Sequence, residues 1–249
     1  MLKGKAALVT GAGSGFGRRV SQLYARNGAK VAVADIVETK GNETVELIQE
    51  AGGEALFIMT DVGKAKDCEN MVKETVRSFG KLDIAFNNAG IGGEPRLIGE
   101  YPIEEWDRQI QINLSGIFYG MRYQIPEMLK TGAGVIVNMS SAFGLVGFSG
   151  ASPYVAAKHA IIGLTKNVAL EYGRKNIRAN AVCPGHTQTP IIENLMKNKE
   201  FSEFLINQYP MGRIAEIDEI VDLILWLSSD KSTFCNGSHF VIDGGFTAR

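Results

Sequence analysis

The sequence has no excess of charge of either sign, because 26 lysine and arginine residues nearly balance 27 aspartate and glutamate residues. The basic residues are spread along the chain and form no cluster that would attract nucleic acid or an anionic membrane. We therefore expect neither nucleic acid nor a membrane among its partners. The expected partner is a small molecule.

Cysteine is scarce, and Cys68, Cys183 and Cys235 lie far apart. An odd number of widely spaced cysteines predicts no disulfide framework. The chain also shows no signal peptide, since residues 1–4 lead directly into a short apolar run. These features favour a cytoplasmic protein.

Long apolar runs are missing as well. The longest stretch without charge, residues 131–157, is interrupted by glycines, by Pro153 and by several serines. It is too polar to cross a bilayer. We interpret it as a buried strand followed by a loop that keeps charge away from a site.

Seven short apolar runs alternate with longer amphipathic ones. They are nearly continuous runs of valine, isoleucine and alanine, which is typical of strands buried on both faces of a parallel sheet. The pattern predicts a Rossmann-type α/β fold, a doubly wound parallel sheet of about seven strands with helices on both faces. The predicted strands are residues 6–9, 30–34, 55–59, 84–86, 134–139, 178–182 and 239–242.

No stretch resembles a linker or an internal repeat, so residues 1–249 are expected to form a single domain. The main irregularity is residues 187–212, an insertion before the last helix and strand. Its amphipathic part carries Ile191, Ile192, Leu195 and Met196. An insertion at one end of a sheet predicts a small lid over a substrate.

A glycine-rich turn, Thr10 to Gly17, follows the first predicted strand and opens a helix that runs through Arg26. It does not fit the spacing G-x-G-x-x-G, but it fits G-x-x-x-G-x-G. Backbone amides at a helix N-terminus bind a pyrophosphate where glycines let it approach. The turn predicts nucleotide binding, although alone it is also compatible with a tight structural turn. The expected cofactor residues here are Gly11, Ser14, Gly15, Phe16 and Gly17.

Asp35 and Ile36 follow the second predicted strand. A carboxylate there accepts hydrogen bonds from an adenosine ribose and repels a 2′-phosphate. Neither Ser14 nor Ile36 supplies a cation that would favour NADP. A lone aspartate in this place is often only a cap or turn residue, but the neighbouring glycine turn favours the cofactor. We therefore predict NAD.

Further motifs follow along the chain, and together with the glycine turn they resemble the short-chain dehydrogenases/reductases over essentially the whole sequence. Their joint occurrence in this order is highly specific. The resemblance implies an NAD-preferring oxidoreductase that interconverts a secondary alcohol and a ketone. The motifs are Asp61-Val62, Asn87-Asn88-Ala89-Gly90, Asn113, Ser141, Tyr154-Val155-Ala156-Ala157-Lys158, Pro184-Gly185 with Thr189, and Asp243-Gly244-Gly245.

The resemblance also implies roles within the cofactor site. Asp61 and Val62 hold the adenine, Asn88 lies along the cofactor, and the segment from Pro184 to Thr189 contacts the nicotinamide carboxamide. Phe16 departs from the family, which usually has isoleucine or leucine there; this alters packing beneath the cofactor rather than abolishing binding. The implied cofactor residues beyond the turn are Asp61, Val62, Asn88, Ala89, Gly90, Tyr154, Lys158, Pro184, Gly185, Thr187 and Thr189.

Tyr154 and Lys158 are four residues apart in a helical stretch, so their side chains lie on one face. Hydride transfer creates or removes an alkoxide-like oxygen, which needs a proton donor or acceptor beside it. A tyrosine with a pKa of about 10 is a poor base at neutral pH, and a close ammonium, helped by the positive charge of an oxidised nicotinamide, lowers that pKa. We predict Tyr154 as general base in oxidation and general acid in reduction, Lys158 as the group that lowers its pKa, and Ser141 as the partner of the substrate oxygen.

By resemblance, Lys158 also binds the nicotinamide ribose, and Asn113 fixes a helix irregularity and an ordered water that passes the proton to solvent. No metal is expected, because His159, His186 and His239 are scattered and lack the spacing of metal ligands. His186 lies within the segment that contacts the nicotinamide. Whether it touches cofactor or substrate stays open.

The residues expected around the substrate are mostly apolar and include no arginine or lysine. This favours an uncharged, hydrophobic alcohol or ketone that is cyclic, aromatic or steroid-like, although the same side chains are equally compatible with the core of a lid. The expected substrate residues are Ser141, Phe143, Phe148, Tyr154, Ile191 and Leu195.

Three alternatives share this fold. An NADPH-dependent 3-ketoacyl reductase has the same active-site residues, but Asp35 argues against it. A sugar or steroid dehydrogenase differs only in its substrate. A non-catalytic NAD-binding sensor would usually have lost Ser141, Tyr154 or Lys158, and all three are present. The resemblance further implies a homotetramer, with a dimer as the alternative.

Overall fold

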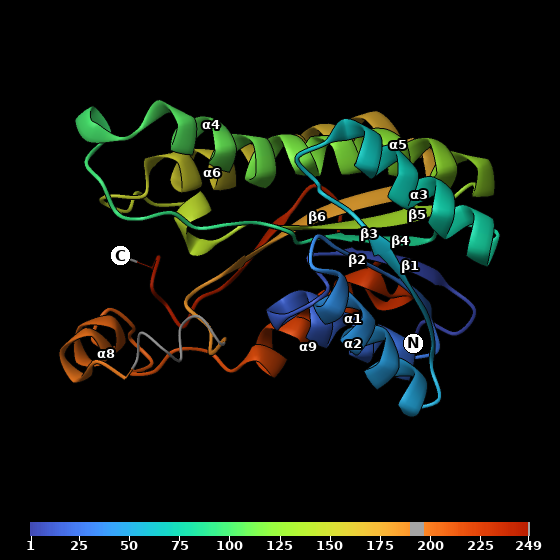
Figure 1. The fold of residues 1–249 in the computed structure, drawn as a ribbon, viewed down its shortest axis with the longest axis horizontal. Coiled ribbons are helices and arrows are strands. Elements are labelled where there is room, and N and C mark those ends of the chain that lie inside the picture. The colour runs from blue at the N-terminus through green and yellow to red at the C-terminus, as the bar shows by residue number, and fades with distance from the viewer. Residues whose placement is uncertain (190–196, 249) are drawn as a thin grey trace.

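A parallel sheet of seven strands forms the centre of the protein (Figure 1). The structure is a computed structural model, and it describes residues 1–189 and 197–248. The strand order is β3-β2-β1-β4-β5-β6-β7. This confirms the doubly wound sheet, and every predicted strand is present to within two residues at either end. The strands are β1 (Ala6–Thr10), β2 (Lys30–Asp35), β3 (Glu54–Met59), β4 (Ile84–Asn87), β5 (Gly134–Met139), β6 (Ile177–Pro184) and β7 (His239–Ile242).

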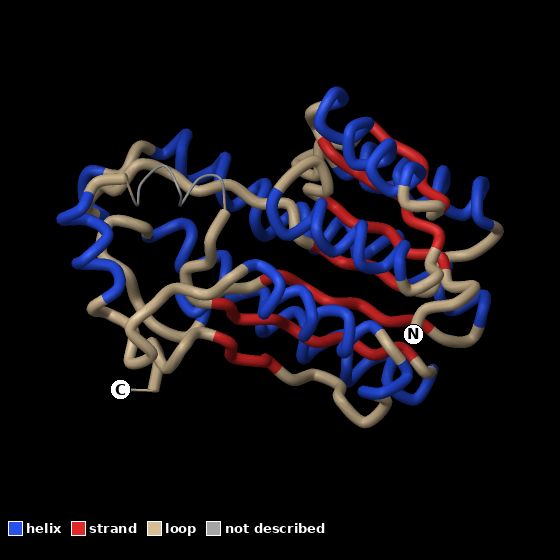
Figure 2. The backbone as a smooth tube through the Cα atoms, turned by 90° about the horizontal axis from the view of Figure 1, so that it is seen from below, coloured by secondary structure: helices blue, strands red, loops and turns tan. Residues whose placement is uncertain are grey.

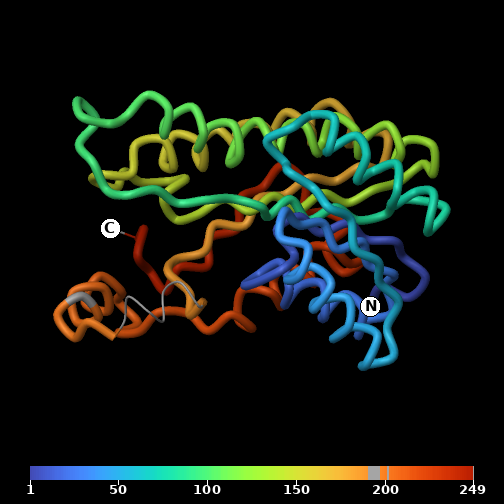
Figure 3. Tube along the Cα trace, in the orientation of Figure 1, coloured from blue at the N-terminus to red at the C-terminus, as the bar shows by residue number. Residues whose placement is uncertain are grey.

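Helices cover both faces of the sheet (Figures 1 and 3). On one face lie α1 (Gly15–Arg26), α2 (Glu38–Glu50) and α9 (Ile217–Ser228). On the other lie α3 (Ala65–Phe79), α5 (Gly116–Thr131) and α6 (Ser152–Tyr172). A further helix, α4 (Ile103–Ile110), continues into α5 through a π-helical turn, Gln111–Ser115. Because helices cover both faces of the sheet, the strand sequences are continuous apolar runs.

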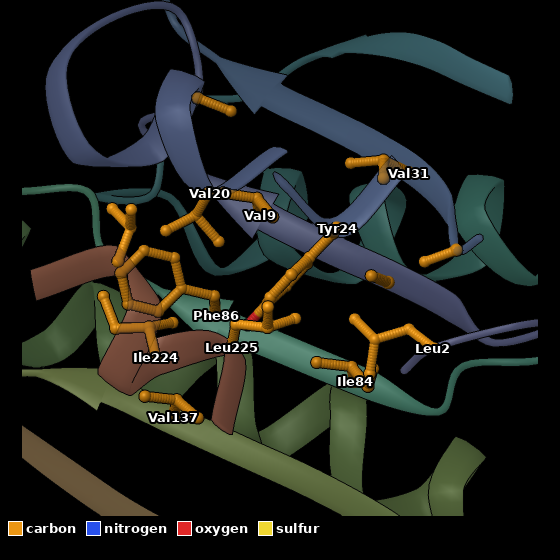
Figure 4. Packing of buried hydrophobic residues seen from close by; sticks show 14 of the residues in the cluster. Leu2, Val9, Val20, Tyr24, Val31, Ile84, Phe86, Val137, Ile224 and Leu225 are labelled. Carbon is orange, nitrogen blue, oxygen red and sulfur yellow. The ribbon is translucent and has the colours of Figure 1, made fainter. Parts of the chain in front are cut away.

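The core beneath α1 and α9 shows how distant segments hold the sheet (Figure 4). Val20 and Tyr24 of α1 pack with Leu225 of α9 against Val9 and Phe86 of the central strands. All five side chains are buried. Burying one such apolar side chain contributes about 2 kcal/mol to stability, so this layer firmly fixes α1 at the end of β1.

The start of α6 is fixed by Pro153 in its first turn, a position that proline favours because its missing N–H would be unpaired there. Tyr154 therefore lies in the first turn of α6, and Lys158 lies one turn later. The local sequence in this way sets the relative position of both predicted catalytic side chains.

The carboxyl ends of all seven strands lie at one edge of the sheet, opposite the N-terminus, where the longer loops gather (Figure 2). The chain direction across the sheet reverses between β1 and β4, so the loops after these strands diverge. Ligands bind at such a point in doubly wound folds. The fold thus places the glycine turn and the catalytic motifs around one crevice.

The predicted lid, residues 187–212, is described in part. It contains α8 (Lys199–Ile206), which lies at the outer end of the molecule beyond the sheet (Figure 1). The expected substrate residues Ile191 and Leu195, together with Ile192 and Met196, lie outside the described residues. Within residues 1–189 and 197–248, the structure holds no helix that is long and apolar enough to span a membrane.

Candidate active site

A cavity of about 1140 Å³ opens at the carboxyl edge of the sheet. It is lined by the loops after β1, β2, β3, β4, β5 and β6, and it brings most of the predicted site residues together. Those that line it are Gly11, Ser14, Gly15, Phe16, Asp35, Ile36, Asp61, Val62, Asn88, Ala89, Gly90, Ser141, Phe143, Phe148, Tyr154, Lys158, Pro184, Gly185 and Thr189.

Three predicted residues do not line this cavity but support its walls. Gly17 is buried beneath the glycine turn, where any Cβ would collide with the backbone of Gly11. Thr187 is buried and donates a hydrogen bond to the Gly185 carbonyl at 3.1 Å. Asn113 is completely buried in the π-helical turn. All three act through neighbouring residues.

Asn113 pairs with both backbone groups of Ile91. Its Oδ1 accepts the Ile91 N–H at 2.8 Å, and its Nδ2 donates to the Ile91 carbonyl at 2.9 Å. The predicted helix irregularity is therefore present, and it attaches α5 to the loop after β4. The ordered water predicted at Asn113 stays a prediction.

The glycine turn adopts backbone conformations that side chains disfavour: Gly11 and Gly15 have φ values of 62° and 50°. A Cβ on Gly11 would also lie 2.9 Å from the Ala89 Cα. The Thr10 hydroxyl accepts the N–H groups of Asn88 and Ala89 at 2.9 and 3.1 Å, which joins this turn to the loop after β4. The turn thus presents unobstructed backbone at the N-terminus of α1, as a pyrophosphate requires.

Asp35 holds the turn from the end of β2. Its carboxylate accepts the N–H of Gly13 at 2.8 Å and the N–H of Val37 at 2.9 Å. The carboxylate also lines the cavity, so it is positioned both to fix the loop and to meet a ligand.

The sequence argument missed two cations at this end of the cavity. Arg18 and Lys40 both line it, from the first turns of α1 and α2. The Arg18 guanidinium forms hydrogen bonds with the Glu43 carboxylate at 2.8 and 2.9 Å, and it donates to the Gly13 carbonyl at 2.6 Å. The sequence argument considered only Ser14 and Ile36 as places for a cation and therefore did not weigh Arg18 and Lys40.

The predicted catalytic residues Ser141, Tyr154 and Lys158 lie at the end of β5 and on α6. The Lys158 ammonium donates to the Met139 carbonyl at 2.8 Å and lies 5.4 Å from the centre of the Tyr154 ring. Ser141 lies close enough to Tyr154 to influence the pKa of the phenol, and its Oγ accepts the Phe143 N–H at 3.2 Å. Ser141, Tyr154 and Lys158 thus form one connected group on the cavity wall.

Burial controls the protonation of this group. It lowers the pKa of Lys158 to about 8 and raises the pKa of Tyr154, an increase that the neighbouring Ser141 opposes. The predicted lowering of the Tyr154 pKa by Lys158 together with an oxidised nicotinamide stays a prediction.

Aromatic rings form the part of the wall next to Ser141. Phe143 packs against Phe148 with ring centres 4.4 Å apart, and it meets the edge of the His186 ring at 5.6 Å. Tyr209 and Phe246 extend the cluster with ring centres 5.3 Å apart. The apolar wall predicted at Phe143 and Phe148 is present, and it continues through residues that the sequence argument had not grouped with them.

A polar wall from α4 was also missed. Gln109 donates to the Tyr101 hydroxyl at 2.8 Å, and both residues line the cavity together with Arg108. The Arg108 guanidinium lies 3.4 Å from the Glu105 carboxylate. The expectation of a lining without a cation was therefore incomplete.

Comparisons with known proteins agree with this geometry. The family model described as Enoyl-(Acyl carrier protein) reductase matches residues 11–247. The cyclohexanol dehydrogenase of Acinetobacter sp. (strain SE19) is 42% identical over 246 residues, which cover 98% of this chain and 96% of that protein. The 2,5-dichloro-2,5-cyclohexadiene-1,4-diol dehydrogenase of Sphingobium indicum (strain UT26) is 41% identical over 249 residues, covering 99% and 98%.

The crystal structure of levodione reductase superposes with a TM-score of 0.96 at 35% identity, covering 100% of this chain and 99% of that one. The chain belongs to the short-chain dehydrogenase/reductase family. It is an alcohol and ketone oxidoreductase of this family, whose members use NAD or NADP.

Proposed function

We propose that the protein is an NAD-dependent dehydrogenase that interconverts a cyclic secondary alcohol and the corresponding ketone. The observation that carries the proposal is that Ser141, Tyr154 and Lys158 line the same cavity as the glycine turn and Asp35. A hydride acceptor held by the turn therefore shares one space with a group that exchanges protons.

The residues present fit a dinucleotide. The exposed backbone at the N-terminus of α1 suits a pyrophosphate, and no acidic residue lies in the first turn of that helix to repel it. Asp35 would bind the adenosine ribose, and Asp61 and Val62 would border the adenine. Lys158 would bind the nicotinamide ribose. When bound, the nicotinamide exchanges hydride with the substrate carbon.

The protein side chains manage the proton. Tyr154 accepts the hydroxyl proton during oxidation and returns a proton to the oxygen during reduction. Ser141 hydrogen-bonds the same oxygen, which lies beside both hydroxyl groups. The positive charge of an oxidised nicotinamide, added to that of protonated Lys158, favours the phenolate that burial alone disfavours.

The substrate class follows from the wall beside Ser141. Phe143 and Phe148 offer flat apolar surfaces, which suit a hydrophobic ring. The two dehydrogenases compared above are named for cyclohexanol and for a cyclohexadiene diol. Both observations support a substrate with a six-membered ring and no charge.

Turnover of an alcohol panel tests this function. NADH or NADPH formation is measured with cyclohexanol, a sterol and a sugar alcohol, each with NAD and NADP. We expect kcat/KM for cyclohexanol with NAD to exceed that for the sugar alcohol by about 100-fold, because burying polar hydroxyls against an apolar wall is costly. Turnover confined to the sugar alcohol would overturn the ring proposal and leave the family unchanged.

The homotetramer is proposed from apolar side chains that the single chain leaves exposed. Ile103, Phe118 and Leu170, on α4, α5 and α6, are exposed, and Phe234 before β7 is completely so. Such surfaces are typical of subunit interfaces. Light scattering should give four times the chain mass of 27.0 kDa; twice that mass would favour the dimer and a single chain mass would exclude both.

The cytoplasmic location is also proposed, from cysteine chemistry. Cys68, Cys183 and Cys235 are free thiols, as the sequence predicted. Free thiols are typical of proteins in a reducing compartment. Fractionation of the source cells should therefore recover the protein with cytoplasmic markers.

A further inference from the structure

His186 is the one histidine that lines the cavity within the described part of the chain, and Tyr209 holds it there. The Tyr209 hydroxyl lies 2.7 Å from the His186 backbone nitrogen and 2.7 Å from its Nδ1. A Cβ added to Gly185 would lie 2.9 Å from Tyr209 Cε1, so the tyrosine ring is packed directly on that glycine. The imidazole is therefore fixed at its backbone and at its ring.

The hydrogen-bond pattern assigns the proton on the imidazole. The His186 N–H donates to the Tyr209 oxygen, so one lone pair of that oxygen is used. Among residues 1–189 and 197–248, Nδ1 is the acceptor within reach of the Tyr209 proton. Tyr209 therefore donates to Nδ1, which leaves the proton of the neutral ring on Nε2.

The Nε2–H faces a different environment. It has no hydrogen-bond partner among the residues that the structure describes, and it is not a fully buried atom. Since His186 lines the cavity beside the Phe143 ring, Nε2–H is a donor open to that space. Burial lowers the pKa of His186, which favours the neutral form of the ring.

We propose that His186 is a specificity residue whose Nε2–H donates a hydrogen bond to a second oxygen of the substrate, one that lies across the ring from the reacting carbon. This rests on the proposed function, which it makes more specific: the preferred substrates are cyclic diols, hydroxyketones or diketones rather than simple ring alcohols. Tyr209 is a positioning residue that keeps the donor on Nε2.

The placement of His186 supports this role. Ser141 and Tyr154 mark where the reacting oxygen binds. Phe143 follows Ser141 by two residues, and its ring packs against the ring of His186. A ring resting on Phe143 has its reacting oxygen at one end and the imidazole near another. A neutral donor suits a hydroxyl or carbonyl oxygen. One relative is named for a cyclohexadiene-1,4-diol, a compound whose two oxygens lie on opposite ring carbons.

The first test compares kcat/KM for trans-1,4-cyclohexanediol and cyclohexanol in the full-length protein. His186→Leu should lower the value for the diol about tenfold and change that for cyclohexanol less than about twofold, since one hydrogen bond is lost. His186→Gln keeps an N–H donor, so its kcat/KM for the diol should fall less than that of His186→Leu. The control is His159→Leu, an exposed histidine on α6, which should change neither value.

Tyr209→Phe tests the positioning role, because it removes the hydroxyl and keeps the ring. It should lower kcat/KM for the diol about threefold and leave that for cyclohexanol unchanged. Equal losses for both alcohols in the Tyr209 and His186 variants would show a structural role and overturn the proposal. A changed Kd for NADH with unchanged diol preference would assign His186 to the cofactor site instead, which also overturns it.

A binding measurement separates this proposal from the proposed function. Cyclohexanone and 1,4-cyclohexanedione are titrated calorimetrically into protein saturated with NAD, which cannot reduce a ketone. The unaltered protein should bind the diketone about tenfold more tightly, and His186→Leu should bind both ketones alike. If neither alcohol is turned over but this difference persists, the proposed function fails and the role of His186 stands. If the alcohols are turned over and the difference is missing, the proposed function stands and the role of His186 fails. If neither alcohol is turned over and the difference is missing, both fail.

Discussion

Tyr154→Phe is expected to lower kcat about 1,000-fold while the Kd for NADH changes less than about twofold. A positioned general acid or base contributes between about 100-fold and 10,000-fold to a rate. Phenylalanine keeps the ring that lies 5.4 Å from the Lys158 ammonium and removes only the hydroxyl that we propose exchanges the proton. Stopped-flow measurement of NADH formation gives kcat, and fluorescence titration gives the Kd.

The matched control is Tyr172→Phe, which makes the same change at the far end of α6. Tyr172 packs against the core and does not line the cavity, so kcat should stay within about twofold of the unaltered protein. Full activity in the Tyr154 variant would remove this residue from the proton transfer. Loss of NADH binding together with activity would instead mean that the hydroxyl holds the cofactor.

Much of this site could be predicted because its signals are local. The glycine turn, the start of α6 at Pro153 and the spacing of Tyr154 and Lys158 each depend on a few neighbouring residues. The strands were found because burial on both faces leaves continuous apolar runs. Asp35 was found because the end of a strand lies at the edge where ligands bind.

The missed residues lie where distant segments meet. Arg18 and Lys40 reach the Asp35 end of the cavity only because α1 and α2 pack side by side. The sequence did offer a signal for both residues, because each lies in the first turn of a helix that follows a strand. Tyr209 and Phe246 join the wall at Phe143 across more than 60 residues of sequence, which no local pattern reveals.

The environment of Tyr154 could not be predicted for a related reason. The sequence shows that Lys158 lies one turn away, but it does not show how much of each side chain the fold covers. In the structure, burial raises the pKa of the phenol, and the neighbouring Ser141 opposes this increase. The depth of a site is a property of the whole fold.

Asp35→Ser is expected to reduce the preference for NAD over NADP, measured as the ratio of their kcat/KM values, about 100-fold. The carboxylate repels a 2′-phosphate, and juxtaposed like charges cost several kcal/mol. Lys40 lines the same end of the cavity, and no ion pair to its ammonium is seen within the described residues. Once the carboxylate is removed, this ammonium is available to the 2′-phosphate. The kcat/KM with NADP should therefore rise while the kcat/KM with NAD falls.

Two further variants make the result specific. Lys40→Ala in the Asp35→Ser protein should remove most of the gain with NADP, because it removes the cation. Asp61→Asn, a charge change at the residue proposed to border the adenine, should alter the KM for both cofactors alike and leave their ratio unchanged. If Asp35→Ser lowers the melting temperature but not the ratio, then the carboxylate serves only to hold the N–H groups of Gly13 and Val37, and the cofactor is selected elsewhere in the cavity.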